Sequence, residues 1–374
     1  MPYFQKTYAA SRAAFLEKAH RLKSKYPATE LLEIRIPDEK EKDLFTDVLY
    51  LPDETKKENL IVVTSGVHGI EGFTGSAIQQ LFLDHVLTEK PQHAFLFVHS
   101  INPFGHKFYR RVSGHNVDLN RNFDLSDNLF SNDNPAYAAF RSLLNPTGPY
   151  RRKTAENLRF ILKTWKALRH SDIKTFRQAV LQGQYTFEKG IFFGGKQFEP
   201  QKEIMEEITC RFAKKHHRII LIDIHTGYGY RGRLHLIGMD DYPDPQIQHQ
   251  LQQLYPYDTI EAADKDKGDF YKISGSMFDF IYKLCDKKNK TVLPMAWEFG
   301  TFDNIKTLKS LASLRIMLNE NQGFHYGYAN DNSRKKVTDE FRNLYYPDDP
   351  SWRKQVLEKG FQTFETLLKN LDSL

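Results

Sequence analysis

The chain of 374 residues contains only two cysteines, Cys210 and Cys285, which excludes a disulfide framework. Such sparse cysteine use is typical of proteins from a reducing compartment. The longest apolar runs, such as Ala94–Val98, fall far short of the ~18 residues that a membrane-spanning helix requires. The first residues, 1–6, lack the basic end and the apolar stretch of a secretory signal. We therefore expect a cytoplasmic protein that has no membrane partner.

A strong excess of one charge is also missing from the sequence. The chain has 53 Lys and Arg against 47 Asp and Glu, a net charge of +6 that is spread along its length. Because no basic cluster stands out, we expect no nucleic-acid partner. Hydrophobic residues make up 40% and charged residues 27%, which is typical of globular proteins and excludes a disordered chain or a fibre.

Short apolar segments rich in β-branched residues alternate with segments whose apolar residues recur at helical spacing. Strands are predicted at 31–36, 44–51, 59–64, 94–99, 218–223, 233–238 and 291–297. Helices are predicted at 7–25, 74–87, 154–168, 172–182, 199–216, 243–254 and 276–285. This alternation predicts an α/β fold, a three-layer α/β/α sandwich around a mixed, mostly parallel sheet.

No linker divides the sequence, so we predict a single domain over residues 1–374. The segment at about 124–200 mixes Asn, Asp, Pro and Arg with helical patterns, and we interpret it as an insertion or lid. It is expected either to narrow the site or to build a contact in a homo-oligomer. The tail at about 304–374 is predicted to be helical, with breaks near 321–332 and 347–350.

Polar side chains follow the predicted buried strands, where ligands bind in open α/β sheets. His68 and Glu71 stand in His-Gly-Ile-Glu-Gly after one strand, His225 follows a second, and Glu298 follows a third. Two imidazoles and one carboxylate form a ligand set of catalytic zinc sites, which leave the fourth position to water. The sequence thus predicts one Zn²⁺ ion held by His68, Glu71 and His225. Glu298 is then the general base for the water.

Donors for an anionic group lie in the loop after the strand at 94–99. Arg111, Asn120 and Arg121 offer hydrogen bonds to a carboxylate or to a developing oxyanion. Arg110 adjoins Arg111, and the sequence does not decide which of the two faces a substrate carbonyl.

Each of these residues also has a purely structural interpretation. A His-x-x-Glu pair is common on solvated surfaces, and His225 is equally compatible with a hydrogen-bonded core histidine. Glu298 could pair with an arginine in the interior, and Asp118 could cap a turn. The placement of all of them just after buried strands, or in a loop beside one, favours the metal site.

The residues in this order resemble the zinc carboxypeptidase family of metallopeptidases, in a little-characterised bacterial branch. The matching segments are His68-x-x-Glu71, Asn102-Pro103-x-Gly105, Arg111, Val117–Phe123, His225, Tyr271, Ser274-Gly275-Ser276 with Asp279, and Glu298. They span residues from about 60 to 303, which is most of the chain. The resemblance implies a metallopeptidase-like catalytic domain with the zinc-peptidase fold.

The resemblance implies roles for the metal centre. His68, Glu71 and His225 match the zinc ligands, with Glu71 binding through both oxygens. Glu298 matches the general base that later returns the proton to the leaving amine. Arg111 matches the residue that polarises the scissile carbonyl and steadies the oxyanion.

It also implies roles around the substrate. Asn120 and Arg121 match the clamp for the terminal carboxylate, and Tyr271 matches a mobile tyrosine that closes over the substrate. Asp118 matches the acid behind the first histidine ligand. Phe278, one residue before Asp279, lies where the family sets side-chain preference, which implies a modest preference for apolar side chains.

One departure opens a second function. Glu298-Phe299-Gly300 is closer to the related aspartoacylase and succinylglutamate desuccinylase group, which keeps a His-Gly-x-Glu turn and an Asn-Arg pair. The expected function is therefore carboxypeptidase-like hydrolysis of an amide next to a free carboxylate, or deacylation of an N-acyl amino acid. The expected partner is a small peptide or an acyl amino acid. A binding module that holds zinc or a peptide without turnover is the alternative from another class.

Overall fold

The computed structural model describes residues 2–53, 58–88, 92–151, 160, 162, 164, 173–239, 244–261, 273–286 and 290–374. Within these residues, eight strands form one sheet in the order β1-β2-β4-β3-β5-β8-β6-β7. β4, β3, β5 and β8 run parallel to one another. β1 pairs with β2, β2 with β4 and β6 with β8 in antiparallel fashion, and the edge strand β7 is parallel to β6. The fold is thus the predicted α/β class with a mixed, mostly parallel sheet.

The strands span β1 Glu30–Arg35, β2 Phe45–Leu51, β3 Asn59–Ser65, β4 Ala94–His99, β5 Arg218–Gly227, β6 Leu234–Ile237, β7 Ile260–Glu261 and β8 Thr291–Gly300. The α-helices span α1 Tyr8–Lys25, α2 Gly72–Thr88, α3 Pro103–Phe108, α4 Pro135–Ala139, α5 Arg141–Leu144, α7 Ile173–Leu181, α8 Pro200–Ala213, α9 Pro245–Leu254, α10 Met277–Asp286, α11 Thr307–Tyr326, α12 Asp331–Tyr345 and α13 Pro350–Leu371. Short 3₁₀ helices span η1 Gly69–Glu71, η2 Leu119–Arg121 and η3 Asp127–Ser131.

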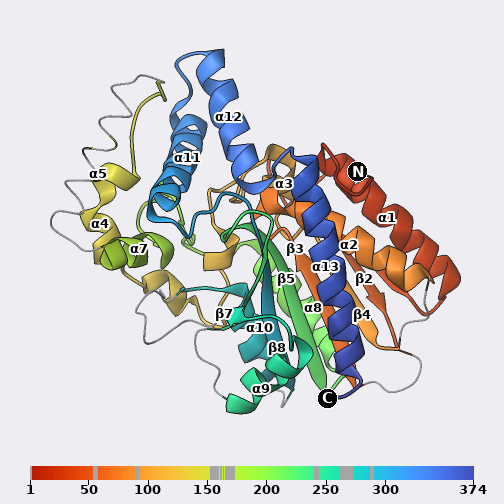
Figure 1. The fold of residues 1–374 in the computed structure, drawn as a ribbon. Helices are drawn as coiled ribbons and strands as arrows, with labels where there is room; N and C mark the ends of the chain where they lie inside the picture. The colour runs from red at the N-terminus through yellow and green to blue at the C-terminus, as the bar shows by residue number, and fades with distance from the viewer. Residues whose placement is uncertain are drawn as a thin grey trace.

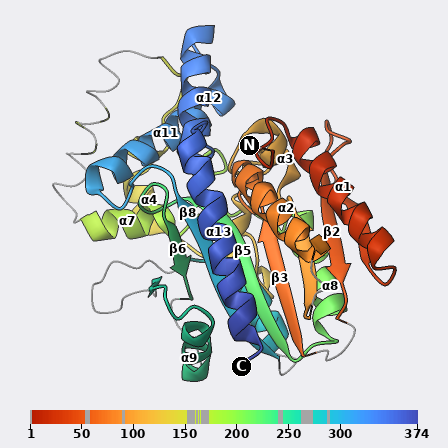
Figure 2. The same cartoon turned by 45° about the vertical axis from the view of Figure 1, so that its right-hand side comes forward.

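The helices cover both faces of the sheet (Figures 1 and 2). α1, α2, α9 and α13 lie on one face, and α8 and α10 lie on the other. Aromatic side chains fill the space between layers: the ring of Phe82 in α2 stacks on Phe364 in α13 at 3.8 Å, and its centroid lies 5.9 Å from that of Trp297 in β8. All three side chains are fully buried, which makes them major contributors to the core.

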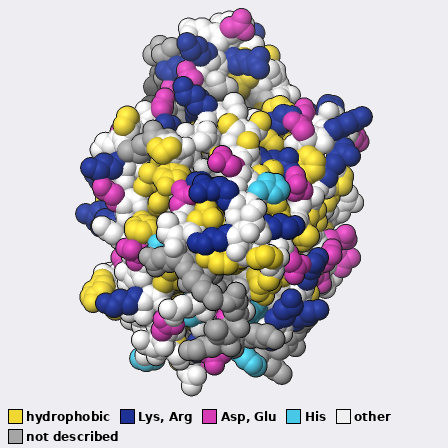
Figure 3. Space-filling model, turned by 90° about the vertical axis from the view of Figure 1, so that its right-hand side faces the viewer, with side chains coloured by type: hydrophobic (Ala, Val, Ile, Leu, Met, Phe, Trp, Pro, Cys, Tyr) yellow, Lys and Arg dark blue, Asp and Glu magenta, His cyan; other side chains and the backbone are white. Residues whose placement is uncertain are grey.

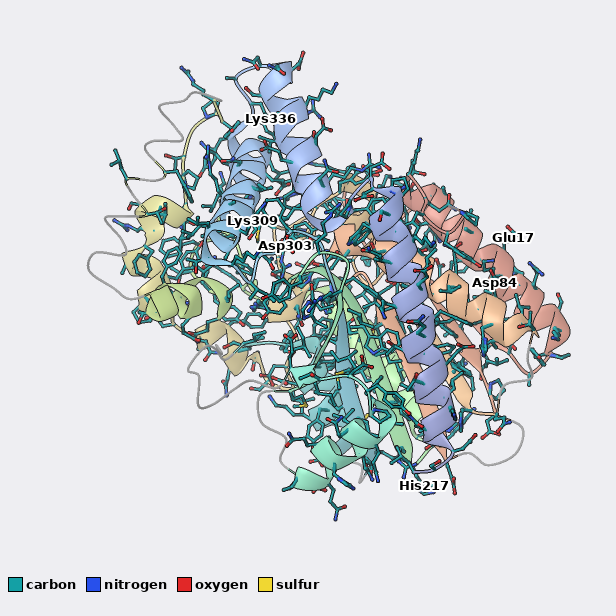
Figure 4. All side chains as sticks on the ribbon, viewed as in Figure 1. Glu17, Asp84, His217, Asp303, Lys309 and Lys336 are labelled. Carbon is teal, nitrogen blue, oxygen red and sulfur yellow. The ribbon has the colours of Figure 1, made fainter. Side chains whose placement is uncertain are left out.

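The carboxyl ends of the central strands meet at one edge of the sheet. His217, labelled in Figure 4, directly precedes β5 at the edge opposite α11 and α12, so β5 runs toward these two helices. The segments after β3, β5 and β8 are therefore brought together there. This is the edge at which ligands bind in such sheets.

A second, smaller apolar core joins the insertion to the tail. It contains Tyr137 of α4, Phe176 of α7 and Phe192 from the insertion, together with Leu314 and Leu318 of α11. The two segments that the sequence analysis separates are therefore packed against each other.

Several predicted boundaries differ from those observed. β5 and β8 extend to Gly227 and Gly300, so His225 and Glu298 lie inside strands rather than after them. The reason is that the two strands stay paired beyond their apolar runs, with His225 opposite Glu298. In the tail, by contrast, the helices are interrupted at 327–330, between α11 and α12, and at 346–349, between α12 and α13, in agreement with the breaks predicted near 321–332 and 347–350. The helix predicted at 154–168 lies almost wholly outside the described residues.

The surface agrees with a balanced charge. On the face that carries α1, Lys and Arg side chains are interspersed with Asp and Glu (Figure 3). Among the described residues, no helix has the length and apolarity that crossing a membrane demands.

Candidate metal centre

A tight turn after β3 presents His68 and Glu71. Glu71 lies in η1, and the backbone N–H groups of Gly69 and Ile70 donate to the carbonyls of Arg111 and Arg110 at 3.0 and 2.8 Å. A Cβ atom on Gly69 would overlap the backbone of Gly105, so only glycine allows the turn to pack this closely on α3. The glycines of the motif thus fix where the two polar side chains point.

The third member of the site comes from the centre of the sheet. In β5, side chains two residues apart point to the same face, which places Asp223 and His225 together. Glu298 lies opposite His225 on the neighbouring strand β8, so their side chains share that face as well.

These elements bring His68, Glu71 and His225 into one buried group. Nδ1 of His68 lies 3.0 Å from Oε1 of Glu71, and Nδ1 of His225 lies 3.0 Å from Oε2. One ligand atom from each residue lies within 4.8 Å of the other two, a spacing that could hold a metal ion. The backbone N–H of Thr226 also donates to Oε2 at 3.0 Å, which orients the carboxylate.

The opposite nitrogen of each imidazole faces another acid. Nε2 of His225 lies 2.6 Å from Oδ2 of Asp223, and Nε2 of His68 lies 3.2 Å from Oδ1 of Asp118. Carboxylates behind histidines are typical of metal sites, because they fix the tautomer that leaves the other nitrogen free for the ion. The donor set, with two Nδ1 atoms and a carboxylate on one side, therefore fits a divalent ion such as zinc.

Sequence reasoning assigned no role to Asp223. The signal was present, because an Asp-x-His pair in a strand places both side chains on one face. Thr64 in β3 completes the arrangement, since its hydroxyl donates to Oδ1 of Asp223 at 2.7 Å.

Arg111 is the arginine that reaches this group. Its Nε donates to Asp118 at 3.0 Å, its Nη1 to Glu71 at 3.4 Å, and its Nη2 lies 2.6 Å from Nε2 of His68. That His68 nitrogen either accepts from Arg111 or donates to Asp118, and a metal ion on Nδ1 requires the second. Arg110 instead forms a buried ion pair with Glu320 of α11 at 2.8 Å, so it faces away.

The charges perturb one another strongly. Burial alone would raise the pKa of Glu71, but the two adjacent imidazoles outweigh it and lower that pKa well below its usual range. Burial opposes protonation of His225, yet Asp223 and Glu71 raise its pKa well above the usual value. Asp118 keeps a strongly lowered pKa because Arg111 and His68 outweigh the cost of its burial. These shifts keep Glu71 and Asp118 ionised, which favours positive charge beside them.

The pKa of Glu298 is raised, whereas that of Glu71 is lowered. Burial, together with the negative charge of Glu71, raises its pKa to about 8, although His225 and the N–H of Tyr228 oppose this. Tyr228 N donates to Oε1 of Glu298 at 2.8 Å, which holds the carboxyl in place. A carboxyl group whose pKa lies near neutrality can accept and return a proton.

The loop that carries Tyr228 is itself fixed. Gly229 N donates to Asn304, Tyr230 N to His235, and Arg231 N to Asp303, which is labelled in Figure 4, each at 2.9 Å. The glycine-rich loop is thus a rigid rim beside Glu298.

The predicted carboxylate clamp lies in η2, next to Asp118. Oδ1 of Asn120 accepts from Met277 N at 3.0 Å, which caps α10 and leaves the Nδ2 group as the donor end of the amide. Arg121 donates through Nε and Nη2 to the Leu181 carbonyl and through Nη1 to the Asn120 carbonyl. Carbonyl acceptors position the guanidinium without neutralising its charge.

The structural interpretation of Asp118 is also correct, because its Oδ1 caps η2 by accepting from Asn120 N at 3.1 Å.

Phe278 lies in the first turn of α10 and packs on the main core. Tyr271 lies outside the described residues.

Sequence reasoning missed Tyr345, at the end of α12. Its phenol is a hydrogen-bond partner of Arg111, and burial raises its pKa. Its ring lies against Gly227, where a Cβ would come within 3.1 Å of the ring and 3.9 Å of Glu298 Oε1. No pattern in the sequence marks this residue, since it ends an ordinary amphipathic helix.

The fold and the site thus define an α/β/α sandwich with a candidate metal centre at the carboxyl edge of its sheet. A family model described as "Protein of unknown function (DUF2817)" matches residues 4–359, so the chain belongs to this family. A search among curated proteins finds no match.

Solved structures with a similar course of the chain share little sequence with it. Bovine thrombin-activatable fibrinolysis inhibitor, in complex with tick carboxypeptidase inhibitor, is 12% identical, with 91% of this chain and 97% of that chain covered and a TM-score of 0.47. Carboxypeptidase A from Helicoverpa armigera is 14% identical, with 90% and 73% covered and a TM-score of 0.46. An aspartoacylase family protein from Mesorhizobium loti is 12% identical, with 80% and 67% covered and a TM-score of 0.37. Carboxypeptidase and aspartoacylase, the names of the second and third of these proteins, are also the names of the two groups to which the sequence motifs were likened.

Proposed function

We propose that the protein is a zinc-dependent hydrolase that cleaves an amide bond next to a free carboxylate, as a carboxypeptidase does. The observation that carries this proposal is the convergence of His68, Glu71 and His225, with Asp118 and Asp223 behind the two imidazoles. Metal-ligating histidines almost always direct their second ring nitrogen at a carboxylate, a carbonyl or water, and both imidazoles have a carboxylate in this position.

In the proposed reaction, Glu298 accepts a proton from the attacking water and later returns it to the leaving nitrogen. Arg111 donates to the carbonyl oxygen as negative charge develops there. Zn²⁺, when bound, supplies Lewis acidity that polarises the carbonyl and lowers the pKa of water. Tyr228 N keeps the Glu298 carboxyl oriented while its charge changes.

Asn120 and Arg121 bind the free carboxylate of the substrate in this proposal. Nδ2 of Asn120 points its donors away from α10, because Oδ1 is used by the helix cap. Nη1 and Nη2 of Arg121 each carry a second N–H besides the one given to the Asn120 and Leu181 carbonyls, and these two donors are proposed to bind the carboxylate. Tyr271 and Phe278 are proposed to cover the substrate and to bias its side chain toward apolar groups.

A second candidate, deacylation of an N-acyl amino acid, uses the same side chains. The observation in its favour is the Glu298-Phe299-Gly300 end of β8, which resembles the aspartoacylase group. Both candidates place a carboxylate next to the scissile amide, so the clamp serves either.

We also propose that the chain works as one catalytic domain, with the insertion as part of its wall. The apolar core shared by the insertion and α11 supports this, since neither segment would bury these side chains alone.

Metal analysis combined with a substrate panel tests the function. Zinc at one ion per chain and turnover of dipeptides, tripeptides, N-acetyl or N-succinyl amino acids are expected, and the preferred class separates the two candidates. Glu298→Gln should keep zinc and lose roughly 10²–10⁴-fold in kcat. Glu199→Gln is the matched control, because Glu199 is also buried but its carboxylate pairs with the exposed His115 and not with a proposed metal ligand.

Wild-type turnover by Glu298→Gln would show that another group acts as the base. Zinc binding without turnover of any member of the panel would favour a binding module.

A further inference from the structure

Within the proposed function, we propose that Phe192, from the insertion, is a positioning residue that fixes Arg111 relative to Arg121. By contacting both side chains, Phe192 sets the distance between Arg111, which is proposed to polarise the carbonyl, and Arg121, which is proposed to bind the carboxylate. The ligand class that this arrangement selects is a compound with a free carboxylate next to the scissile amide.

The ring of Phe192 lies close to both guanidinium groups. Its centroid is 5.2 Å from Cζ of Arg111 and 5.5 Å from Cζ of Arg121, both within the range of cation–π attraction. Two guanidinium groups in one buried region repel each other. An aromatic ring in contact with both attracts each of them, so it stabilises a fixed pair of positions.

The backbone of Phe192 is held in an uncommon conformation. Its φ of 53° lies in the left-handed region, which a bulky aromatic residue rarely adopts. Such backbone strain persists only where the surroundings enforce it, and it is concentrated at functional sites.

The surroundings do enforce it here. Gln184 N donates to the Phe192 carbonyl at 3.1 Å, and Asp118 N donates to the Phe193 carbonyl at 2.7 Å. The side-chain amide of Asn122 donates to the Gly194 carbonyl at 2.7 Å. Asp118 and Asn122, which flank the carboxylate clamp, are therefore bonded to the two residues after the strained position, and Gln184 is bonded to the strained residue itself.

The insertion holds Arg121 from a second direction as well. Nη2 of Arg121 donates to the Leu181 carbonyl at 2.6 Å, at the end of α7. Tyr185 donates its hydroxyl to the Arg121 carbonyl at 2.8 Å. Arg111, in contrast, is anchored by Asp118 outside the insertion. Phe192 is thus a residue of the insertion whose side chain lies close to both Arg111 and Arg121.

A purely apolar role in the smaller core is the competing explanation, because Phe192 is also one of its buried members. Phe176 separates the two roles. It belongs to the same core and is equally buried, but its ring packs on Phe140. Phe176→Leu therefore removes a core ring without changing the ring near Arg111 and Arg121.

The experiment compares Phe192→Leu, Phe192→Tyr and Phe176→Leu with the wild type, each loaded with zinc. kcat/KM is measured on an N-acyl dipeptide and on its C-terminal amide, and calorimetry measures the binding of N-acetylphenylalanine and of its amide. Phe192→Leu should lose about 10-fold of the preference for the free carboxylate, the size of one desolvated cation–π contact. Phe192→Tyr should restore that preference, and Phe176→Leu should lower Tm and leave the preference intact.

An unchanged preference in Phe192→Leu, or an equal loss in Phe176→Leu, overturns the role of Phe192 and leaves the proposed hydrolase standing. A wild-type protein that neither cleaves nor binds the carboxylate compounds overturns the proposed function, and the role of Phe192 with it.

Discussion

Asp223 has the same relation to His225 that Asp118 has to His68. Each acid lies beside Nε2 of its histidine, at 2.6 Å for Asp223 and 3.2 Å for Asp118, and Nδ1 of each ring faces Glu71. Such acids raise the basicity of the imidazole and fix its ring, and their loss typically costs 10–100-fold in metal affinity.

Asp223→Asn is therefore expected to weaken zinc binding by about 10–100-fold, because the amide keeps the shape of the acid and loses its charge. Competition with a zinc chelator of known affinity measures this. Asp47→Asn is the matched control, since Asp47 is a buried acid bonded to Arg12 and remote from the centre. It should lower Tm and leave zinc affinity unchanged. Equal affinities in Asp223→Asn and the wild type would contradict the assignment.

At the scale of elements, strands were easier to predict than the ends of strands. β4 was predicted at its observed bounds, because a short apolar run between polar turns has one interpretation. β5 and β8 were predicted too short, because His225 and Glu298 break the apolar pattern while the strands remain paired. Polar residues inside a buried strand disturb the apolar pattern that reveals the strand.

In the candidate site, too, some residues could be predicted from the sequence and others could not. His68, Glu71 and His225 could be found because the chemistry of a metal restricts its ligands to a few residue types. Tyr345 and Phe192 could not be found, since their contacts with the candidate site depend on how the tail and the insertion pack. Nothing in the local sequence records such contacts between distant segments.

The end of α11 contains a histidine that should make stability depend on pH. His325 is partly buried, and burial together with the charges of Arg110 and Lys189 lowers its pKa to about 4. The folded protein therefore binds fewer protons than the unfolded chain between pH 6.5 and 4. The contribution of His325 to the free energy of unfolding is therefore fully present above pH 6.5. It is lost progressively as the pH falls from 6.5 toward 4.

His325→Gln should remove this part of the acid sensitivity. Relative to the variant, the wild type should lose about 1–2 kcal/mol of unfolding free energy between pH 7 and pH 4, a value reduced for the partial exposure of the ring. Urea unfolding at several pH values measures it. Parallel curves for the two proteins would contradict the lowered pKa.

At the scale of the whole molecule, the candidate metal centre joins segments that are distant in sequence. Glu71 follows β3, His225 lies in β5, and Arg111 and Asp118 come from the loop after β4. α12 from the tail packs on the same turn, through contacts of Ile70 with Phe341 and Leu344. An ion held there binds only the folded chain, so it should stabilise the molecule as a whole.

Removal of zinc with a chelator should therefore lower Tm by several degrees, and added zinc should restore it. An ion present at 1,000 times its Kd stabilises the folded state by about 4 kcal/mol, because the unfolded chain does not assemble the three ligands. Differential scanning calorimetry with and without zinc measures the shift, and His225→Gln provides the control because it removes one ligand while Glu71 and His68 remain. A Tm shift of the same size in this variant would mean that zinc stabilises the protein from another position. If the variant shows no Tm shift with zinc, the stabilisation depends on the three proposed ligands.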